Sequence, residues 1–123
     1  MTDMVDISLT CSSSSNLELK GKLFRGLAEP SRLTILEALR HGALSVTELV
    51  GATRLSQSNV SNHLACLHGC GLVIREQHGR HVYYRLSSEL VATLVGLADH
   101  VLADVAKGLC TCPRCNSSPG LTR

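Results

Sequence analysis

Residues 45–69 read SVTELVGATRLSQSNVSNHLACLHG, and this stretch decides the fold. Ser45 followed three residues later by Glu48 is the pattern of a capping box, which predicts a short helix over residues 46–52. After a brief break, Ser56 is placed to cap a second helix that runs to the end of the stretch. Two short helices joined by so brief a turn predict a helix-turn-helix.

The sequence before this stretch predicts two more helices. An apolar stripe at helical spacing predicts the first over residues 17–28. Pro30 suits the first turn of the second, because the first N–H groups of a helix have no partner within it. The pair His41-Gly42 is expected to end this helix. The side chains that it is expected to bury are Leu33, Ile35, Leu36 and Leu39.

The sequence after the stretch predicts a β-hairpin and a long helix. Residues 72–77 and 81–86 are rich in Val, Ile, Leu and Tyr, and Gly79 supplies the positive φ that the tight turn between them needs. A helix capped at residues 87–88 is expected to run to about Lys107. Its apolar residues cover more than one face, so one face can pack on the domain while the other needs a partner. This pattern predicts a homodimer.

The region of residues 51–86 is locally basic within a chain whose net charge is only +2. It holds four arginines and one carboxylate, Glu76, which suits a face that meets phosphates, although an ordinary solvated face would show the same imbalance. The second helix of the opening stretch begins with Gln, Ser and Asn, which read base edges in a major groove. Arg80, at the tip of the hairpin, is placed to reach an adjacent minor groove, with Arg75 or Arg85 on its flanks. The residues that we expect to bind double-stranded DNA are Arg54, Ser56, Gln57, Ser58, Asn59, Ser61, Asn62, His63 and Arg80.

Two cysteines on the same predicted helix suggest a metal site. Cys66 and Cys70 are four residues apart, so they share one helix face and their sulfurs can reach a single ion. A lone helix cysteine is more often a small buried hydrophobe, but this pair accompanies a cysteine-bearing C-terminal segment. Cys110, Cys112 or Cys115 of that segment is available as a further ligand. Thiolate ligands favour soft ions such as cadmium, lead or mercury.

The predicted elements together indicate a winged helix-turn-helix, a mainly α fold of about five helices with a two-stranded wing. The 123 residues suit one domain, and a content of 44% hydrophobic and 18% charged residues is that of a globular protein rather than a disordered one. We expect residues 1–16 to form a flexible N-terminal arm, residues 17–108 the DNA-binding and dimerisation domain, and residues 109–123 a mobile tail that carries cysteines.

The chain shows no sign of export or of membrane insertion. No stretch has the pattern of a signal peptide or the roughly 18 to 20 uninterrupted apolar residues of a membrane span. We therefore expect a cytoplasmic protein without a membrane partner. Six cysteines in such a protein favour metal binding or redox chemistry over a disulfide framework.

Several motifs resemble those of the ArsR/SmtB family of metal-sensing repressors. The resemblance implies a winged-helix homodimer whose first and last helices form the interface. It also implies repression of a metal efflux or resistance operon, with binding to operator DNA in the metal-free state and release when metal binds. The motifs that carry it are residues 26–36 (GLAEPSRLTIL), 55–64 (LSQSNVSNHL), 71–73 (GLV) and 79–86 (GRHVYYRL).

Within that family, residues 64–72 (LACLHGCGL) resemble the cadmium- and lead-sensing branch. This resemblance implies that Cys66, Cys70 and one tail cysteine bind the metal, and Cys110 best matches the family's spacing. It implies no obligatory cofactor, with Cd(II) or Pb(II) as inducer and Hg(II) or Zn(II) as alternatives. The sequence departs from the family because its tail holds three cysteines instead of one. Additional or replacement ligands for Cys110 are therefore Cys112, Cys115 and Cys11.

A repressor of the same fold that senses thiol oxidation is the alternative function. In that case the tail cysteines would form disulfides when they are oxidised. An enzyme is not expected, because no His, Asp or Asn is spaced to activate a cysteine nucleophile in a recognisable pattern.

Overall fold

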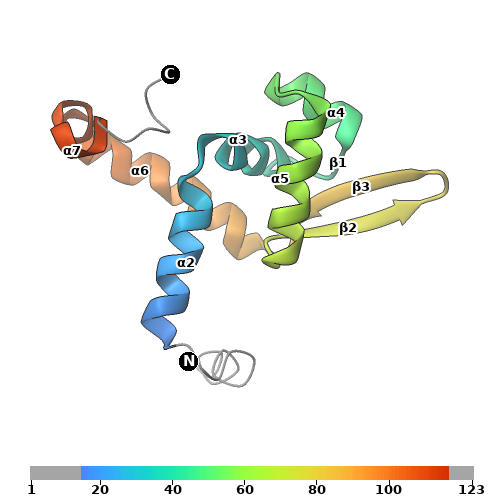
Figure 1. Ribbon diagram of the computed structural model, residues 1–123, viewed down its shortest axis with the longest axis horizontal. Helices are drawn as coiled ribbons and strands as arrows, with labels where there is room; N and C mark the ends of the chain where they lie inside the picture. The colour runs from blue at the N-terminus through green and yellow to red at the C-terminus, as the bar shows by residue number, and fades with distance from the viewer. Residues whose placement is uncertain (1–14, 117–123) are drawn as a thin grey trace.

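The computed structural model describes residues 15–116, and Figure 1 shows its helices and strands. Helices α3, α4 and α5 pack together, and the hairpin of β2 and β3 projects from them at one end of the molecule. The long helix α6 extends toward the other end, and α2 runs downward across it (Figure 1). The elements are α2 (Asn16–Ala28), α3 (Pro30–Leu39), β1 (Leu44–Ser45), α4 (Val46–Thr53), α5 (Gln57–Gly69), β2 (Val73–His78), β3 (His81–Leu86), α6 (Glu89–Thr111) and α7 (Pro113–Asn116).

The helix-turn-helix is confirmed, and its local signals do what their sequence predicts. Ser45 Oγ accepts the N–H of Glu48 at 3.2 Å, and the Glu48 carboxylate accepts the N–H of Ser45 at 2.9 Å, which completes the capping box. Ser56 Oγ accepts the N–H of Asn59 at 3.1 Å and caps α5. Between the two helices, Arg54 has a φ of 65°, and this left-handed residue turns the chain from α4 into α5.

The wing has one strand more than predicted. The hairpin of β2 and β3 is confirmed, with Gly79 at a φ of 65° in its turn. The two residues of β1 also pair with β3, Leu44 opposite Tyr84, so the sheet has the order β1-β3-β2 and is antiparallel throughout. A strand of two residues has no periodicity to detect, and its pairing partner is distant along the chain. Sequence patterning therefore missed it.

The last helix ends four residues later than its predicted end at Lys107, because α6 continues to Thr111. Glycine in a helix lowers its stability by only about 1 kcal/mol relative to alanine, so Gly108 does not end α6. Pro113 does, because it disfavours helical geometry at the preceding residue, and Cys112 has an extended backbone with ψ at 116°. Cys110 therefore lies on α6, although we expected a mobile tail from residue 109 onward.

The ends of the chain are only partly described. Residues 1–14, which include Cys11 and most of the expected N-terminal arm, lie outside the described residues, as do residues 117–123 of the expected tail. Ser15 caps α2 through Glu18, so the first helix starts one residue earlier than predicted. None of the helices within residues 15–116 has the length and apolar character that crossing a membrane requires.

The core lies where α3, α4 and α5 meet, closed by the base of the wing and by α6. Ile35, Leu36 and Leu39 of α3 are buried as predicted, but Leu33 is only half-buried. Leu33 instead lines an apolar groove between α2 and α6. The other buried side chains of this core are Leu27, Leu49, Val60, Leu64, Leu67, Val73, Leu86 and Val95.

Truncating the centre of this core should destabilise the fold strongly. Leu36 is fully buried, so we expect Leu36→Ala to lower the free energy of unfolding by about 2 to 5 kcal/mol. Urea unfolding at one fixed protein concentration measures this change. The matched control is Leu90→Ala, since Leu90 is 74% exposed, and it should change stability by less than about 0.5 kcal/mol. Equal losses in the two variants would contradict this description of the core.

Candidate DNA-binding face and cysteine pair

Helix α5 presents a polar face and buries an apolar one. Val60, Leu64 and Leu67 recur at helical spacing and hold the helix to the core. The polar residues between them lie on the outside of the helix. There they can form hydrogen bonds with the base edges in a groove of a nucleic acid. The exposed members of this polar face are Gln57, Ser58, Asn59, Ser61 and Asn62.

His63 does not lie on the polar face with the other predicted DNA-binding residues. Its side chain is only 21% exposed, and its Nε2 atom lies 3.8 Å from the carboxylate of Glu29. Glu29 is the N-cap of α3, where its carboxylate accepts the N–H of Arg32 at 3.0 Å. His63 therefore connects α5 to the junction of α2 and α3.

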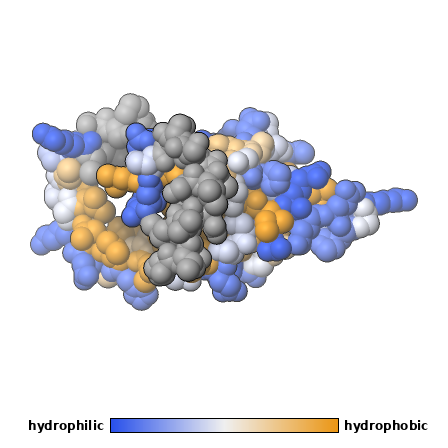
Figure 2. Space-filling view, turned by 90° about the horizontal axis from the view of Figure 1, so that it is seen from below, coloured by the Kyte–Doolittle hydropathy of each residue, from blue (hydrophilic) through white to orange (hydrophobic). Residues whose placement is uncertain are grey.

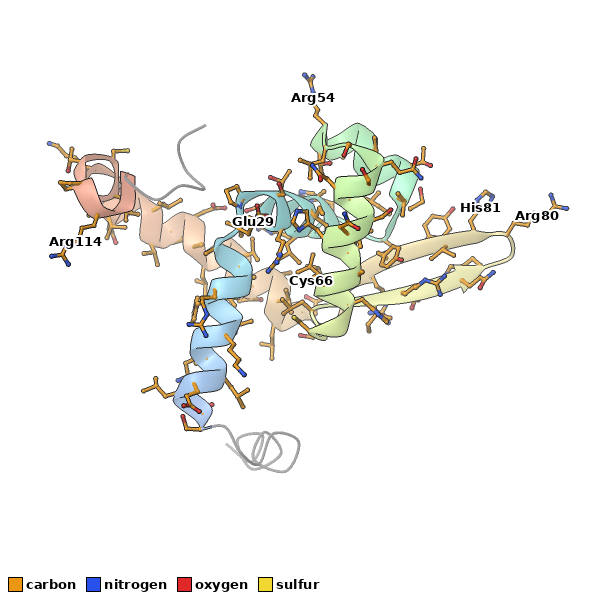
Figure 3. The ribbon with its side chains drawn as sticks, in the orientation of Figure 1. Glu29, Arg54, Cys66, Arg80, His81 and Arg114 are labelled. Atoms are coloured by element: carbon orange, nitrogen blue, oxygen red, sulfur yellow. The ribbon has the colours of Figure 1, made fainter. Side chains whose placement is uncertain are left out.

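The basic residues flank the polar face at two points. Figure 3 shows Arg54 pointing outward from the turn between α4 and α5, and Arg80 at the tip of the wing. Both are exposed. Arg85 is different, because its Nε donates to Glu76 at 2.8 Å. This hydrogen bond lowers the pKa of Glu76 below its ordinary value, so the pair stays ionised and the charge of Arg85 is largely compensated.

Cys66 and Cys70 lie together at the C-terminal end of α5. Cys66 is half-buried, Cys70 is the exposed C-cap, and neither forms a disulfide. Because the two residues are four apart at the end of one helix, their side chains are neighbours on one face of α5. Partial burial raises the pKa of the Cys70 thiol above its ordinary value, and the neighbouring Cys66 raises it further, while the positive charge of Arg32 acts in the opposite direction.

The structure brings two predicted metal ligands together but not the third. In Figure 1 the C-terminal end of α6 lies at the opposite end of the molecule from the wing, so Cys110 of the same chain does not complete the pair on α5. Within residues 15–116 of one chain, no three His, Cys, Asp or Glu side chains are grouped to hold one ion. Two adjacent thiols are suitable ligands for a soft ion, but two ligands do not complete its coordination. The remaining ligands have to come from another part of the protein or from a second chain.

Sequence reasoning missed Glu29, which lies 3.8 Å from His63 of α5, and Arg32, whose backbone N–H the Glu29 carboxylate accepts. Figure 3 shows Glu29 and Cys66 on the two sides of the space between the α2–α3 junction and α5. One signal was present in the sequence, because Arg32 is the one basic residue of α3 and stands directly before Leu33. Such a residue needs a reason to be there.

An apolar groove of about 870 Å³ runs between α2 and α6. Phe24, Leu97 and Val101 line it, and each is more than half exposed. Figure 2 shows apolar side chains gathered toward the end of the molecule opposite the wing, which is the end that α6 reaches. An exposed apolar groove between two helices is a feature typical of interaction sites.

Comparison with known proteins identifies the family. A family model described as "Bacterial regulatory protein, arsR family" matches residues 29–75. The chain is 46% identical over 83 residues to the HTH-type transcriptional regulator CmtR of Mycobacterium tuberculosis, covering 67% of this chain and 70% of CmtR. It is 39% identical over 93 residues to a Streptomyces lividans protein named "Probable mercury resistance operon repressor", covering 76% and 74% of the two chains.

Solved structures agree with the sequence relatives. The NMR structure of the cadmium sensor CmtR from Mycobacterium tuberculosis matches with a TM-score of 0.56 and 45% identity, covering 62% of this chain and 79% of that one. A homodimeric winged helix-turn-helix DNA-binding domain from Mycobacterium bovis matches with a TM-score of 0.65 and 32% identity, covering 76% and 90%. The winged helix-turn-helix predicted from the sequence is thus confirmed. The chain belongs to the ArsR family, whose members are DNA-binding transcriptional regulators and not enzymes.

Proposed function

We propose that this protein is a homodimeric repressor that binds operator DNA in the metal-free state and releases it when a soft heavy-metal ion binds. Release would derepress a metal efflux or resistance operon. The observation that carries the proposal is the placement of Cys66 and Cys70 four residues apart at the C-terminal end of α5, the helix that presents the polar face. The same helix thus carries both the polar face and the two thiols. Binding of an ion to the thiols can therefore change the orientation of the polar face.

The polar face of α5 is the surface that enters the major groove. Gln57 and Asn59 are residue types that pair with adenine edges, while Ser58 and Ser61 can donate or accept. Arg54 and Arg80 lie outside this face and contact the phosphates or the minor groove beside it. His63 Nε2 lies 3.8 Å from the Glu29 carboxylate, so we assign it a role in supporting the helix and not in reading bases.

Neutralising the wing tip should weaken DNA binding without changing its sequence preference. Arg80 is exposed and projects from the hairpin, so we expect Arg80→Gln to remove about one phosphate contact and to reduce the slope of log affinity against log salt by about 1. Fluorescence anisotropy at several salt concentrations measures the slope. The control is Arg25→Gln on α2, which removes the same charge away from α5 and the wing. An unchanged slope in Arg80→Gln would remove the wing tip from the interface.

A second copy of the chain is the partner that covers the apolar groove. The residues on both walls of the groove are apolar, which suits burial against an identical surface. The Mycobacterium bovis neighbour is a homodimer, which supports this choice of partner. Two copies would also present two α5 helices, as an operator with two half-sites requires.

The ligands proposed for the ion are Cys66 and Cys70 of one subunit and Cys110 of the other. Cys110 is on α6, and α6 is a wall of the groove that the second copy covers, so dimerisation brings this helix near the partner. Three thiolates suit Cd(II) or Pb(II), with Hg(II) or Zn(II) as weaker candidates. When bound, the ion links α5 to the dimer interface. The alternative third ligands are Cys112, which is half-buried, Cys115 and Cys11.

Mixed dimers test whether the ligands come from two subunits. One subunit carries Cys66→Ser and Cys70→Ser, and the other carries Cys110→Ser. If the third thiolate comes from the partner, this mixed dimer keeps one complete site and binds one cadmium ion, although each homodimer binds none tightly. If all three thiolates belong to one subunit, the mixed dimer has no complete site. Cadmium–thiolate absorbance in the ultraviolet reads out the difference.

Metal affinity should rise steeply with pH. The raised pKa of Cys70 means that this thiol keeps its proton to a higher pH than an ordinary thiol, and a thiol must lose its proton to bind metal. Below the thiol pKa values, we expect cadmium affinity to rise about tenfold per pH unit for each such thiol. Competition with a chelator of known affinity at three pH values gives the slope. A flat profile would mean that thiols are not the ligands.

Operator release tests the function as a whole. Labelled operator DNA is titrated with the protein at fixed salt, and cadmium, lead, mercury, zinc and peroxide are then added in separate experiments. Release by stoichiometric cadmium or lead supports the proposal and ranks the ions. Release by peroxide alone, with no response to metals, would instead support the thiol-oxidation alternative.

A further inference from the structure

Helix α3 connects the long helix α6 to the helix-turn-helix. It packs against α6 and also against α4 and α5. Val95 of α6 is buried in the same core as Leu36 and Leu39 of α3. Apolar contacts of this kind are non-directional, so they hold α6 against α3 without fixing its orientation tightly. A polar contact at the C-terminal end of α3 supplies the missing direction.

This polar contact is made by Arg40, the C-cap of α3, which lies against Gly96 of α6. A Cβ atom on Gly96 would stand 2.8 Å from Nη2 of Arg40 and 3.4 Å from its Cζ atom. The first distance is shorter than an ordinary van der Waals contact. The guanidinium therefore occupies the space that a side chain at position 96 would fill.

Two carboxylates orient the guanidinium on α6. Nη1 of Arg40 lies 2.9 Å from the carboxylate of Glu37 on α3 and 3.7 Å from that of Asp99 on α6. Asp99 follows Gly96 by three residues, so the two lie on the same face of α6. Ion pairs that are partly exposed contribute little to stability, but the planar guanidinium holds a defined geometry between them. The contact thus fixes the orientation of α6 more than it stabilises the fold.

Gly96 serves this contact and not the groove that we assign to the second copy of the chain. Glycine inside a helix is unfavourable relative to alanine, and Gly96 lies within the 23 residues of α6. The groove is lined by other residues of α6, among them Leu94, Ala98 and Val101. With about 3.6 residues per turn, Gly96 lies on the side of α6 opposite to these three. One side of α6 is therefore available for the partner while the other is held by Arg40.

We propose that Arg40 is a positioning residue that fixes the orientation of α6 on α3 and thereby sets the separation of the two α5 helices in the dimer. The inference rests on the proposed function, since it takes α6 to form the subunit interface and α5 to bind DNA. The role needs no contact between Arg40 and the DNA, because Arg40 acts through the placement of α6.

The ligand that follows from this role is operator DNA with one fixed spacing between its half-sites. One base pair more or less between two half-sites rotates one of them by about 35° and moves it by about 3.4 Å. A dimer whose α5 helices are held rigidly cannot bind both half-sites after such a change. A dimer in which α6 can turn on α3 can adapt to it.

The test compares Arg40→Gln and Gly96→Ala with the wild-type protein. Gly96→Ala adds only one methyl group, which displaces the guanidinium, and a depression of about 410 Å³ beside the contact has room for the displaced group. The matched controls are on α2. Gly21→Ala adds the same methyl group at 3.9 Å from Nη1 of Arg25, an ordinary contact that displaces nothing, and Arg25→Gln removes the same charge.

The probe is a palindromic duplex that wild type selects from random sequence. It is accompanied by duplexes with one base pair added or removed between the half-sites, and by one isolated half-site. Both variants should bind the selected duplex about tenfold more weakly, which is part of the 100- to 10,000-fold gain from linked binding, and should distinguish the spacings by less than about twofold. Half-site affinity and dimerisation, measured by anisotropy and sedimentation, should not change. The Arg40→Gln/Gly96→Ala double variant should lose no more than either single variant, because both changes remove one contact.

An unchanged spacing preference in folded, dimeric variants would overturn the inference. Equal losses for the half-site and the full duplex would also overturn it, because Arg40 would then act on the helix-turn-helix itself. If Arg40→Gln does not fold, Gly96→Ala carries the test, since alanine favours the helix. The wild-type protein separates these outcomes from failure of the proposed function. If wild type neither dimerises nor selects a duplex, the function itself is refuted, whereas a strict spacing that both variants keep removes only the role of Arg40.

Discussion

Replacing Cys66 by Ser should leave operator binding intact in the metal-free protein and abolish cadmium-induced release. The hydroxyl is a harder and far weaker ligand than a thiolate, so the variant loses one of its two adjacent soft ligands. The polar face of α5 is unaffected, because Cys66 is half-buried on the side toward Glu29. In wild type we expect cadmium to weaken operator binding by about 5- to 150-fold, the usual range for coupling between two sites. In Cys66→Ser this factor should fall to near one.

The matched control for this experiment is Ala65→Ser. It introduces a hydroxyl at the neighbouring exposed position of α5 and should behave as wild type. Cys70→Ser should behave as Cys66→Ser, since both cysteines are proposed ligands of the same ion. Loss of DNA binding by metal-free Cys66→Ser would make the cysteine structural. Persistent release by cadmium would place the metal site elsewhere in the protein.

Placing a charge in the apolar groove should separate the subunits and nearly abolish operator binding. Val101 lines the groove on α6 and is 57% exposed in the single chain. A buried carboxylate without a partner strongly opposes burial of this surface, so Val101→Asp should be monomeric at concentrations where wild type is dimeric. A monomer binds one half-site and loses the gain from linked binding, which is about 100- to 10,000-fold. Sedimentation and anisotropy measure the two effects.

The control is Thr93→Asp, which adds the same charge to α6 at an exposed position outside the groove. It should remain dimeric and bind the operator. Val101→Asp should also keep its helical content, because Val101 does not belong to the buried core. If Val101→Asp remained a dimer with wild-type affinity, the groove would not be the subunit interface.

Most of the fold could be predicted because its signals are local. The capping interactions of Ser45 with Glu48 and of Ser56 with Asn59 join residues three positions apart. The two helices of the helix-turn-helix can therefore be predicted from a short stretch of sequence. The apolar spacing that holds α5 to the core is equally local. The end of α6 was harder to place, because Gly108 only weakens a helix and the decisive residue is Pro113.

The candidate site was predicted only where its residues share one element. Cys66 and Cys70 are neighbours on any helix, so their pairing follows from their spacing. The place of Cys110 depends on where α6 points, and in a single chain it points away from the pair. The contact of His63 could not be predicted from the sequence either. Its position on the helix is compatible with a contact to a base and with the contact to Glu29 that the structure has.

The sequence by itself determined the two helices of the helix-turn-helix, the wing hairpin and the pairing of the two cysteines on α5, because each depends on contacts between residues a few positions apart. Tertiary structure decided which charges meet across elements. It paired Arg85 with Glu76 and turned His63 toward Glu29. These contacts depend on how α3 and the strands are oriented against their neighbours. Side-chain burial across the whole core sets that orientation, and no local pattern encodes it.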